Sequence, residues 1–131
     1  MLLPIALTTA GVAALVNFWL SLRCATLRSS ENIWIGDGGN AKLTARMRAQ
    51  GNFAEYVPVV LILIALVEWA TGSPLWLMIV AGLFLLGRVL HAFGMDGWQP
   101  GRFAGMLFTA PIMIGLGLYA IAIPLFHLGH P

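Results

Sequence analysis

Four long apolar stretches, separated by short polar segments, set the pattern of the chain. They cover residues 3–22, 53–70, 75–95 and 103–128. A helix rises about 1.5 Å per residue, so stretches of this length suit a bilayer hydrocarbon core roughly 30 Å thick. The pattern predicts an all-α integral membrane protein with four transmembrane helices.

The connections between these stretches predict how the helices are arranged. Residues 29–41 are rich in Gly, Ser, Asn and Asp, which is typical of a loop. Residues 71–74 and 96–101 are short turns, and Pro74 suits the start of the third helix. Short connections join antiparallel neighbours, so one up-down four-helix bundle is expected over residues 1–131. The expected helices cover approximately residues 3–28, 42–70, 75–95 and 102–128.

The composition supports a membrane location and excludes some functions. Hydrophobic residues make up 60% of the 131 residues and charged residues only 9%, against about 25% charged in soluble domains. The mean hydropathy is +0.88. The chain lacks a basic stripe with interleaved aromatics, so no nucleic-acid partner is expected. A signal peptide has a positively charged region before its apolar core, whereas residues 1–22 contain no charged side chain. This favours a retained first helix over a cleaved signal peptide.

The distribution of cations predicts an orientation. Lysine and arginine gather around the first loop and at the two helix ends beside the third connection, and are absent from the middle turn. The positive-inside rule therefore places the first and third connections in the cytosol and both termini on the non-cytosolic side. The residues concerned are Arg23, Arg28, Lys42, Arg46, Arg48, Arg88 and Arg102.

Three smaller features receive ordinary structural interpretations. Cys24 is expected to be a packed small thiol, with a reactive thiol as the alternative. His127 and His130 have neither a carboxylate nor a cysteine nearby, so no metal site is expected there. Gly101 and Gly105 match a GxxxG pattern, which permits close contact between helices.

The most informative polar residues open the second helix, in the segment RMRAQGNFAEYVP. Arg48, Asn52, Glu55 and Tyr56 follow one another at i, i+4, i+7 and i+8. At about 100° per residue they fall within an arc of about 100°, on one face of the helix. A cation, an amide, a carboxylate and a phenol together exceed what anchoring in the interface requires. This face therefore predicts a site for a charged, hydrogen-bonding ligand.

Polar residues of the other helices fall at the same depth. Counting about 20 residues back from Trp69 places Arg48 near the inner interface. The same count from Leu75 places Arg88 and His91 on one face of the third helix, at a similar level. The cations that close the first helix and open the fourth lie in the same layer. One polar layer near the cytosolic surface is therefore expected.

Simpler interpretations compete for these residues. Glu55 and Arg88 could form a structural ion pair between two helices, because a lone carboxylate in hydrocarbon is costly. His91 could be a packed or capping histidine. Arginine and lysine near helix ends often only reach the headgroups. That role is expected of Arg23, Lys42 and Arg46.

The segment RAQGNFAEYVP resembles a motif of the MAPEG family, the membrane-associated proteins in eicosanoid and glutathione metabolism. It matches the family pattern R-x3-N-x2-E-Y-x-P at the start of the second helix. The resemblance extends over most of the chain. It includes the length, the four helices, the polar layer near the cytosolic surface and the spacing of the cations. The resemblance implies a homotrimer that binds glutathione between adjacent subunits, near the cytosolic side.

The resemblance also implies roles for single residues. Glu55 would face the amino group of glutathione, and Arg48 its carboxylates, with Asn52 and Tyr56 on the same face. Arg102 lies where the leukotriene synthase has its thiolate-activating arginine. The further ligand contacts implied are Arg28, Gln50, Arg88 and His91, with Gln50 acting from another face or subunit. In the eicosanoid enzymes two tyrosines occupy the positions held here by His91 and Met95. This chain therefore departs from those enzymes at two ligand-contacting positions, which argues against the same ligand geometry and against an eicosanoid substrate.

The function expected from the resemblance is a membrane-embedded, glutathione-dependent transferase or peroxidase. A free thiol has a pKa of about 8.5, and a nearby guanidinium favours the nucleophilic thiolate. A lowering of roughly two pH units requires about 2.7 kcal/mol, which one shielded arginine can supply. The thiolate would attack a lipophilic electrophile dissolved in the membrane.

Two other functions compete with this one. A non-catalytic lipid-binding or scaffold protein would keep the same fold without conjugating activity. A small channel or transporter would need a polar path across the whole membrane. The outer halves of the predicted helices are apolar apart from Glu68, which disfavours a channel.

Overall fold

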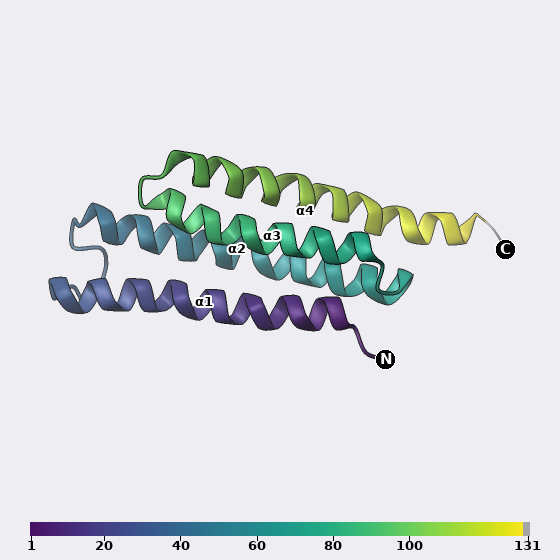
Figure 1. Ribbon diagram of the computed structural model, residues 1–131, viewed down its shortest axis with the longest axis horizontal. Helices are drawn as coiled ribbons and strands as arrows, with labels where there is room; N and C mark the ends of the chain where they lie inside the picture. Colours follow the sequence, from purple (N-terminus) through teal and green to yellow (C-terminus); the bar gives the residue numbers. More distant parts are fainter. Residues whose placement is uncertain (130–131) are drawn as a thin grey trace.

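The computed structural model describes residues 1–129 and arranges them as four antiparallel α-helices (Figure 1). The predicted four-helix fold is confirmed, and every helix is long and apolar enough to cross a membrane. His130 lies outside the described residues, so the pair that it forms with His127 in the sequence is not placed. The helices are α1 (Pro4–Glu31), α2 (Ala41–Thr71), α3 (Leu75–Met95) and α4 (Gln99–Leu128).

The helix ends differ by a few residues from the expected ones, for local reasons. Helix α1 continues to Glu31 and stops where Asn32 adopts the left-handed conformation, with φ of 53°. Asn40 caps α2, its carboxamide oxygen accepting the N–H of Leu43 at 3.0 Å. Helix α4 begins three residues early because Pro100 fits in a first helical turn.

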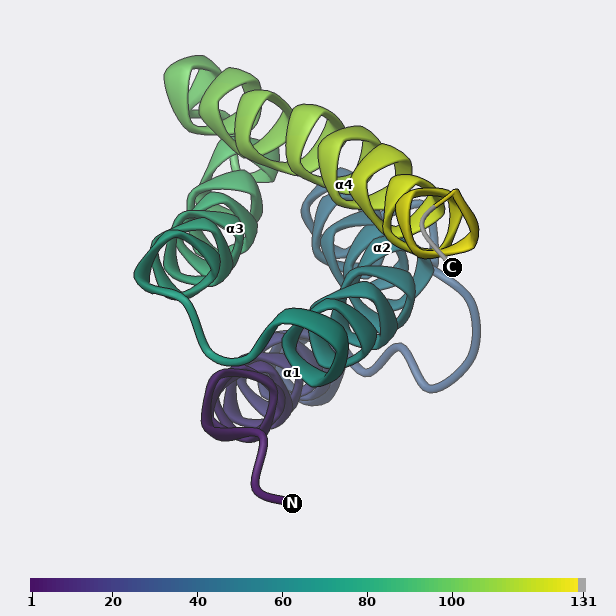
Figure 2. The ribbon, with the colours of Figure 1, turned by 90° about the vertical axis from the view of Figure 1, so that its right-hand side faces the viewer.

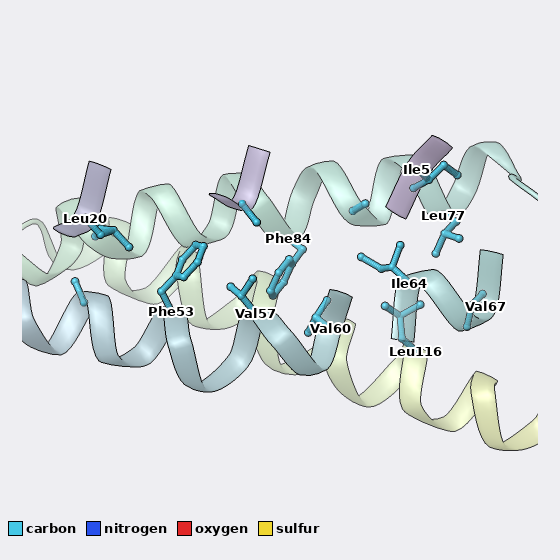
Figure 3. Close-up of a cluster of buried hydrophobic side chains, with 14 residues drawn as sticks. Ile5, Leu20, Phe53, Val57, Val60, Ile64, Val67, Leu77, Phe84 and Leu116 are labelled. Carbon is cyan, nitrogen blue, oxygen red and sulfur yellow. The ribbon is translucent and has the colours of Figure 1, made fainter. Parts of the chain in front are cut away.

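The core is a seam between α2 and α3 that α1 and α4 complete (Figure 3). Its α2 side is a stripe with alternating spacings of four and three residues: Phe53, Val57, Val60, Ile64 and Val67. Its α3 side begins with Leu77, Ala81 and Phe84. Arg88 and His91 continue this stripe with the same spacing. The seam thus changes from apolar to polar towards the end of the bundle that carries the α1–α2 and α3–α4 connections. We call this the loop end, and the opposite end, with residues 72–74, the turn end.

Glycines bring α3 and α4 into close contact. A Cβ on Gly94 would lie 2.1 Å from the backbone nitrogen of Arg102, and one on Gly105 would lie 2.4 Å from the Cβ of His91. Gly101 is equally enclosed, which confirms the close contact predicted from GxxxG. In the described residues, α4 packs on α2 and α3 but not on α1 (Figure 2).

Helix α1 is fastened at the turn end by a carboxylate from α2. Glu68 is 1% exposed and accepts the N–H groups of Ile5 at 2.9 Å and Ala6 at 2.8 Å. The hydroxyl of Ser73 donates to the same carboxylate at 2.6 Å. Helix α1 has no N-capping side chain of its own, so Glu68 satisfies its first free N–H groups and its positive dipole end.

At the loop end α1 is fastened by an ion pair between Arg23 and Asp96. The Arg23 guanidinium also lies 4.9 Å from the ring centroid of Trp19 and 5.8 Å from that of Phe93. Arg46 donates to the Arg23 carbonyl at 2.8 Å. The interpretation that these two arginines only reach the headgroups is therefore wrong, because both join neighbouring helices.

Candidate functional site

A cavity of about 250 Å³ lies between α2, α3 and α4 at the loop end. Six of its lining residues are site residues predicted from the sequence: Arg48, Asn52, Tyr56, Arg88, His91 and Arg102. The other lining residues are Met95, Met106, Thr109 and Ala110. Three helices therefore bring the predicted cations, the amide, the phenol and the imidazole to one place.

Each helix presents its residues to the cavity through simple helical spacing. On α2, Arg48, Asn52 and Tyr56 are four residues apart and form one stripe. This stripe lies beside the apolar stripe that begins with Phe53, so packing of the core turns the polar stripe towards the cavity. On α3, Arg88 and the residues that follow it prolong the buried seam into the same space.

Arg88 is the most enclosed charged group of the cavity, with 3% of its surface exposed. Its Nη1 donates to the Oδ1 of Asn52, and its Nη2 to the Gly105 carbonyl at 3.0 Å. The guanidinium lies 5.9 Å from the ring centroid of Tyr56. Its Nε is buried without a hydrogen-bond partner among residues 1–129. The alternative in which Arg88 pairs with Glu55 is wrong for this chain, because the amide of Asn52 takes that place.

The charge of the cavity is positive and uncompensated. Three guanidinium groups line it, and no carboxylate is among the described residues that do so. An unpaired buried charge costs several kcal/mol, and guanidinium groups bind carboxylates and phosphates through paired hydrogen bonds. The arrangement therefore suits a small ligand with more than one negative charge.

Helix α4 contributes residues that the sequence analysis missed. Thr109 donates its hydroxyl to the Gly105 carbonyl at 2.7 Å, the same carbonyl that accepts from Arg88. Met106, Thr109 and Ala110 stand at i+4, i+7 and i+8 from Arg102. This spacing matches that of the polar face on α2, so it could have revealed them.

Two predicted ligand contacts lie away from the cavity and have partners in their own chain. Arg28 donates to the carbonyls of Gly36 at 2.6 Å and Ile33 at 3.3 Å, which holds the α1–α2 loop on the end of α1. Gln50 lies on the opposite side of α2 and donates to the Ser21 hydroxyl at 2.6 Å. Their contacts with a ligand stay predictions.

Glu55 also lies outside the cavity. Its side chain is exposed on α2 and makes no ion pair within the described part of the chain. On a helical projection it sits at the edge of the arc, about 100° away from Tyr56, so it points out of the bundle while Tyr56 points inward. An exposed carboxylate on a membrane helix is costly, so a partner outside this chain would be favourable.

Comparisons with known proteins agree with the motif on α2. The model of the MAPEG family matches residues 6–122. The inner membrane protein YecN of Escherichia coli strain K12 is 33% identical over 86 residues, and the same protein from strain O6:H1 matches equally. The matched region spans 65% of this chain and 65% of the relative's own length.

Proposed function

The chain belongs to the MAPEG family of integral membrane proteins, and on this premise we propose that its arginine-lined cavity binds glutathione. One observation carries the proposal: the buried cation Arg88 lines the cavity together with two more arginines, and no carboxylate is among the described lining residues. Glutathione has two carboxylates and an ionisable thiol. It supplies the negative charge that this cavity lacks.

The cavity suggests a division of roles. Arg48 and Arg88 pair with the carboxylates, while Arg102 faces the sulfur and favours the thiolate over the thiol. The thiol proton passes to water. The thiolate then forms a bond with the carbon of a lipophilic electrophile, whose leaving group departs with the bonding electrons. Met106 and Ala110 both line the cavity and are exposed on α4, which would give an apolar electrophile a route from the lipid.

We propose that the site is completed by a neighbouring copy in a homotrimer. Glu55 is exposed beside the cavity instead of inside it, where it is free to contact a ligand held by an adjacent subunit. Gln50 and Arg28 would join the site in the same way. The concentration of cations at the loop end supports an orientation with this end in the cytosol and the termini on the other side.

Isothermal titration calorimetry of the protein in detergent tests the proposal. Glutathione is expected to bind the wild type, and Arg48→Gln to weaken binding by about tenfold through loss of a charged hydrogen bond. Arg48 is exposed, so the fold should tolerate the change. Lys42→Gln is the matched control: it removes an exposed cation of α2 away from the cavity and should leave the affinity unchanged. Absence of binding heat in the wild type contradicts the proposal.

A lipid-binding protein without conjugating activity is the second candidate. A larger apolar cavity of about 510 Å³ favours it, since this cavity lies between α1 and α3 at the turn end, lined by residues such as Ile5, Met78 and Leu85. Conjugation of glutathione to a generic aryl halide separates the two functions. Steady turnover supports the transferase, and glutathione binding without any turnover favours the second candidate.

A further inference from the structure

The connection between α1 and α2 exposes two large apolar side chains next to each other. Trp34 is 75% exposed and Ile35 is 92% exposed. The preceding residue, Ile33, is partly buried instead and packs against the small cluster that contains Leu27 and Leu43. Exposed hydrophobic residues are common singly, but an adjacent tryptophan and isoleucine at the tip of a connection point to a binding partner.

Hydrogen bonds hold the backbone on both sides of this pair. Arg28 donates to the carbonyl of Ile33, just before the pair, at 3.3 Å, and to the carbonyl of Gly36, just after it, at 2.6 Å. The chain bends at Ile35 and Gly36, and Gly36 has φ of 68°, in the left-handed region that favours glycine. The connection is therefore fixed in a conformation that keeps Trp34 and Ile35 exposed.

The same arginine places the connection at the level of the membrane surface. The Nη2 of Arg28 donates to the Sδ of Met47 at 3.4 Å, so one guanidinium joins the connection to the start of α2. Met47 directly precedes Arg48, which the count of about 20 residues from Trp69 puts near one surface of the hydrocarbon core. The connection therefore lies at the depth of the lipid headgroups.

The connection also projects sideways from the bundle. Figure 2 looks along the helices, and in this view the connection leaves the outline of α1 and α2. All four helices are long and apolar enough to cross a membrane, so a lipid leaflet surrounds the bundle at this level. Tryptophan is enriched at this depth of a bilayer, because its ring is apolar and its N–H can reach water or a headgroup.

We propose that Trp34 and Ile35 insert into the boundary between headgroups and acyl chains of the leaflet at the loop end, and that the α1–α2 connection is a lipid-binding surface. The polar side chains beside the pair are occupied within the chain: Arg28 by the carbonyls, and Asp37 by the N–H of Gly39 and the hydroxyl of Thr44. They leave an apolar contact without directed hydrogen bonds, which suits lipid better than a protein partner. The inference does not depend on glutathione binding.

Electron paramagnetic resonance of a single nitroxide label tests the proposal on the full chain in phosphatidylcholine nanodiscs. Cys24 is the single cysteine of the sequence, so in a Cys24→Ala background Ile35→Cys carries the only label. Oxygen, which concentrates in lipid, should relax this label more strongly than a water-soluble nickel chelate does. Glu31→Cys, at the exposed end of α1, is the matched control, and the chelate should relax its label more strongly than oxygen does.

Two results of this experiment overturn the proposal. If the chelate relaxes the label at position 35 as strongly as the control label, the pair lies in water. If neither reagent relaxes the label at position 35, protein covers the pair, and a second copy of the chain takes the place assigned to lipid. Both results leave glutathione binding by the wild type untouched, so the proposed function stands or fails separately.

Trp34→Leu provides a second measurement that needs no label. The variant loses the fluorescence of Trp34 alone, so the difference from the wild type reports where this indole lies. The lost emission should be blue-shifted, and phospholipids brominated near the headgroup should quench it. Red-shifted emission that these lipids do not quench contradicts insertion.

Discussion

The interface between α3 and α4 and the packing of α1 represent two ways of holding a helix in this bundle. Helices α3 and α4 meet through glycines along the loop half of their contact, with no room for a Cβ at Gly94, Gly101 or Gly105. Helix α1 is fastened by polar contacts near its two ends, through Glu68 and through Arg23. Between these points apolar cavities of about 510 and 290 Å³ lie along its contact with α3.

The difference shows which part of the molecule can position a site accurately. A glycine contact fixes two backbones relative to each other, so side chains on both helices keep their separation. The candidate site uses this interface: Arg88 and His91 come from α3 and Arg102 from α4, and the Gly105 carbonyl of α4 accepts a hydrogen bond from Arg88. Helix α1 contributes no lining residue to the cavity. Changes to the α3–α4 interface should therefore affect ligand binding, whereas changes to the fastening of α1 at the turn end should affect stability alone.

The largest effect is expected from Gly105→Ala. The added methyl group meets the Cβ of His91 and the Gly87 carbonyl, so it forces the helices apart and displaces the cavity wall. Overpacking of this kind costs about 1–3 kcal/mol, and glutathione binding should be lost. Gly115→Ala is the control on the same helix, because a Cβ there meets nothing within 4 Å. Thermal unfolding in detergent and calorimetry measure both; equal behaviour of the two variants contradicts the role of the interface.

Asn52→Leu should have the next largest effect. Asn52 accepts from Arg88, and its loss removes one of the two bonds that orient the buried guanidinium. Glutathione affinity is expected to fall by about 10–100-fold, corresponding to roughly 1.5–3 kcal/mol for a bond to a charged group. Asn17→Leu removes an exposed amide of α1 that does not line this cavity, and should leave the dissociation constant unchanged. Similar losses in both variants show that the cavity is not the binding site.

Glu68→Gln tests the fastening of α1 at the turn end. The amide keeps one oxygen acceptor for two backbone N–H groups and loses the charge at the helix N-terminus. A loss of about 1–2 kcal/mol in the free energy of unfolding is expected, with glutathione affinity unchanged. Glu31→Gln, at the exposed end of α1, is the control and should leave the unfolding transition in place. A glutathione affinity that falls with Glu68→Gln contradicts the independence of the two regions.

The smallest effect is expected from Asp96→Asn, which removes the ion pair with Arg23 at the loop end. The Asp96 side chain is 31% exposed, and exposed pairs contribute about 0–1 kcal/mol. Trp19 and Phe93 still hold the guanidinium in place. A chemical unfolding curve should move only slightly. A loss as large as that of Gly105→Ala shows that α1 depends on this pair far more than its exposure suggests.

The sequence predicted the site well where helical periodicity alone decides the outcome. The stripe of Arg48, Asn52 and Tyr56 depends on spacing within one helix, and the structure places it as expected. Glu55 lies at the edge of the same arc, and which way it points depends on the packing of α2 against the other helices. The helix boundaries were close because local caps such as Asn40 define them.

Contacts between helices distant in the sequence could not be predicted in this way. Glu68 accepts from backbone N–H groups more than 60 residues away, and no side-chain pattern marks such a partner. The same holds for Gln50, whose partner Ser21 is set by the register of α1 on α2. Periodicity shows which residues share a face of a helix, and the relative position of two helices is decided by packing.

A structure of the protein with glutathione, determined in detergent or in a lipid nanodisc, would show whether glutathione occupies the arginine-lined cavity. We expect glutathione against α2, α3 and α4 at the loop end, with its carboxylate oxygens within hydrogen-bond distance of the Arg48 and Arg88 guanidinium groups. Glutathione at another place, or a cavity filled by a neutral lipid at saturating glutathione, contradicts it.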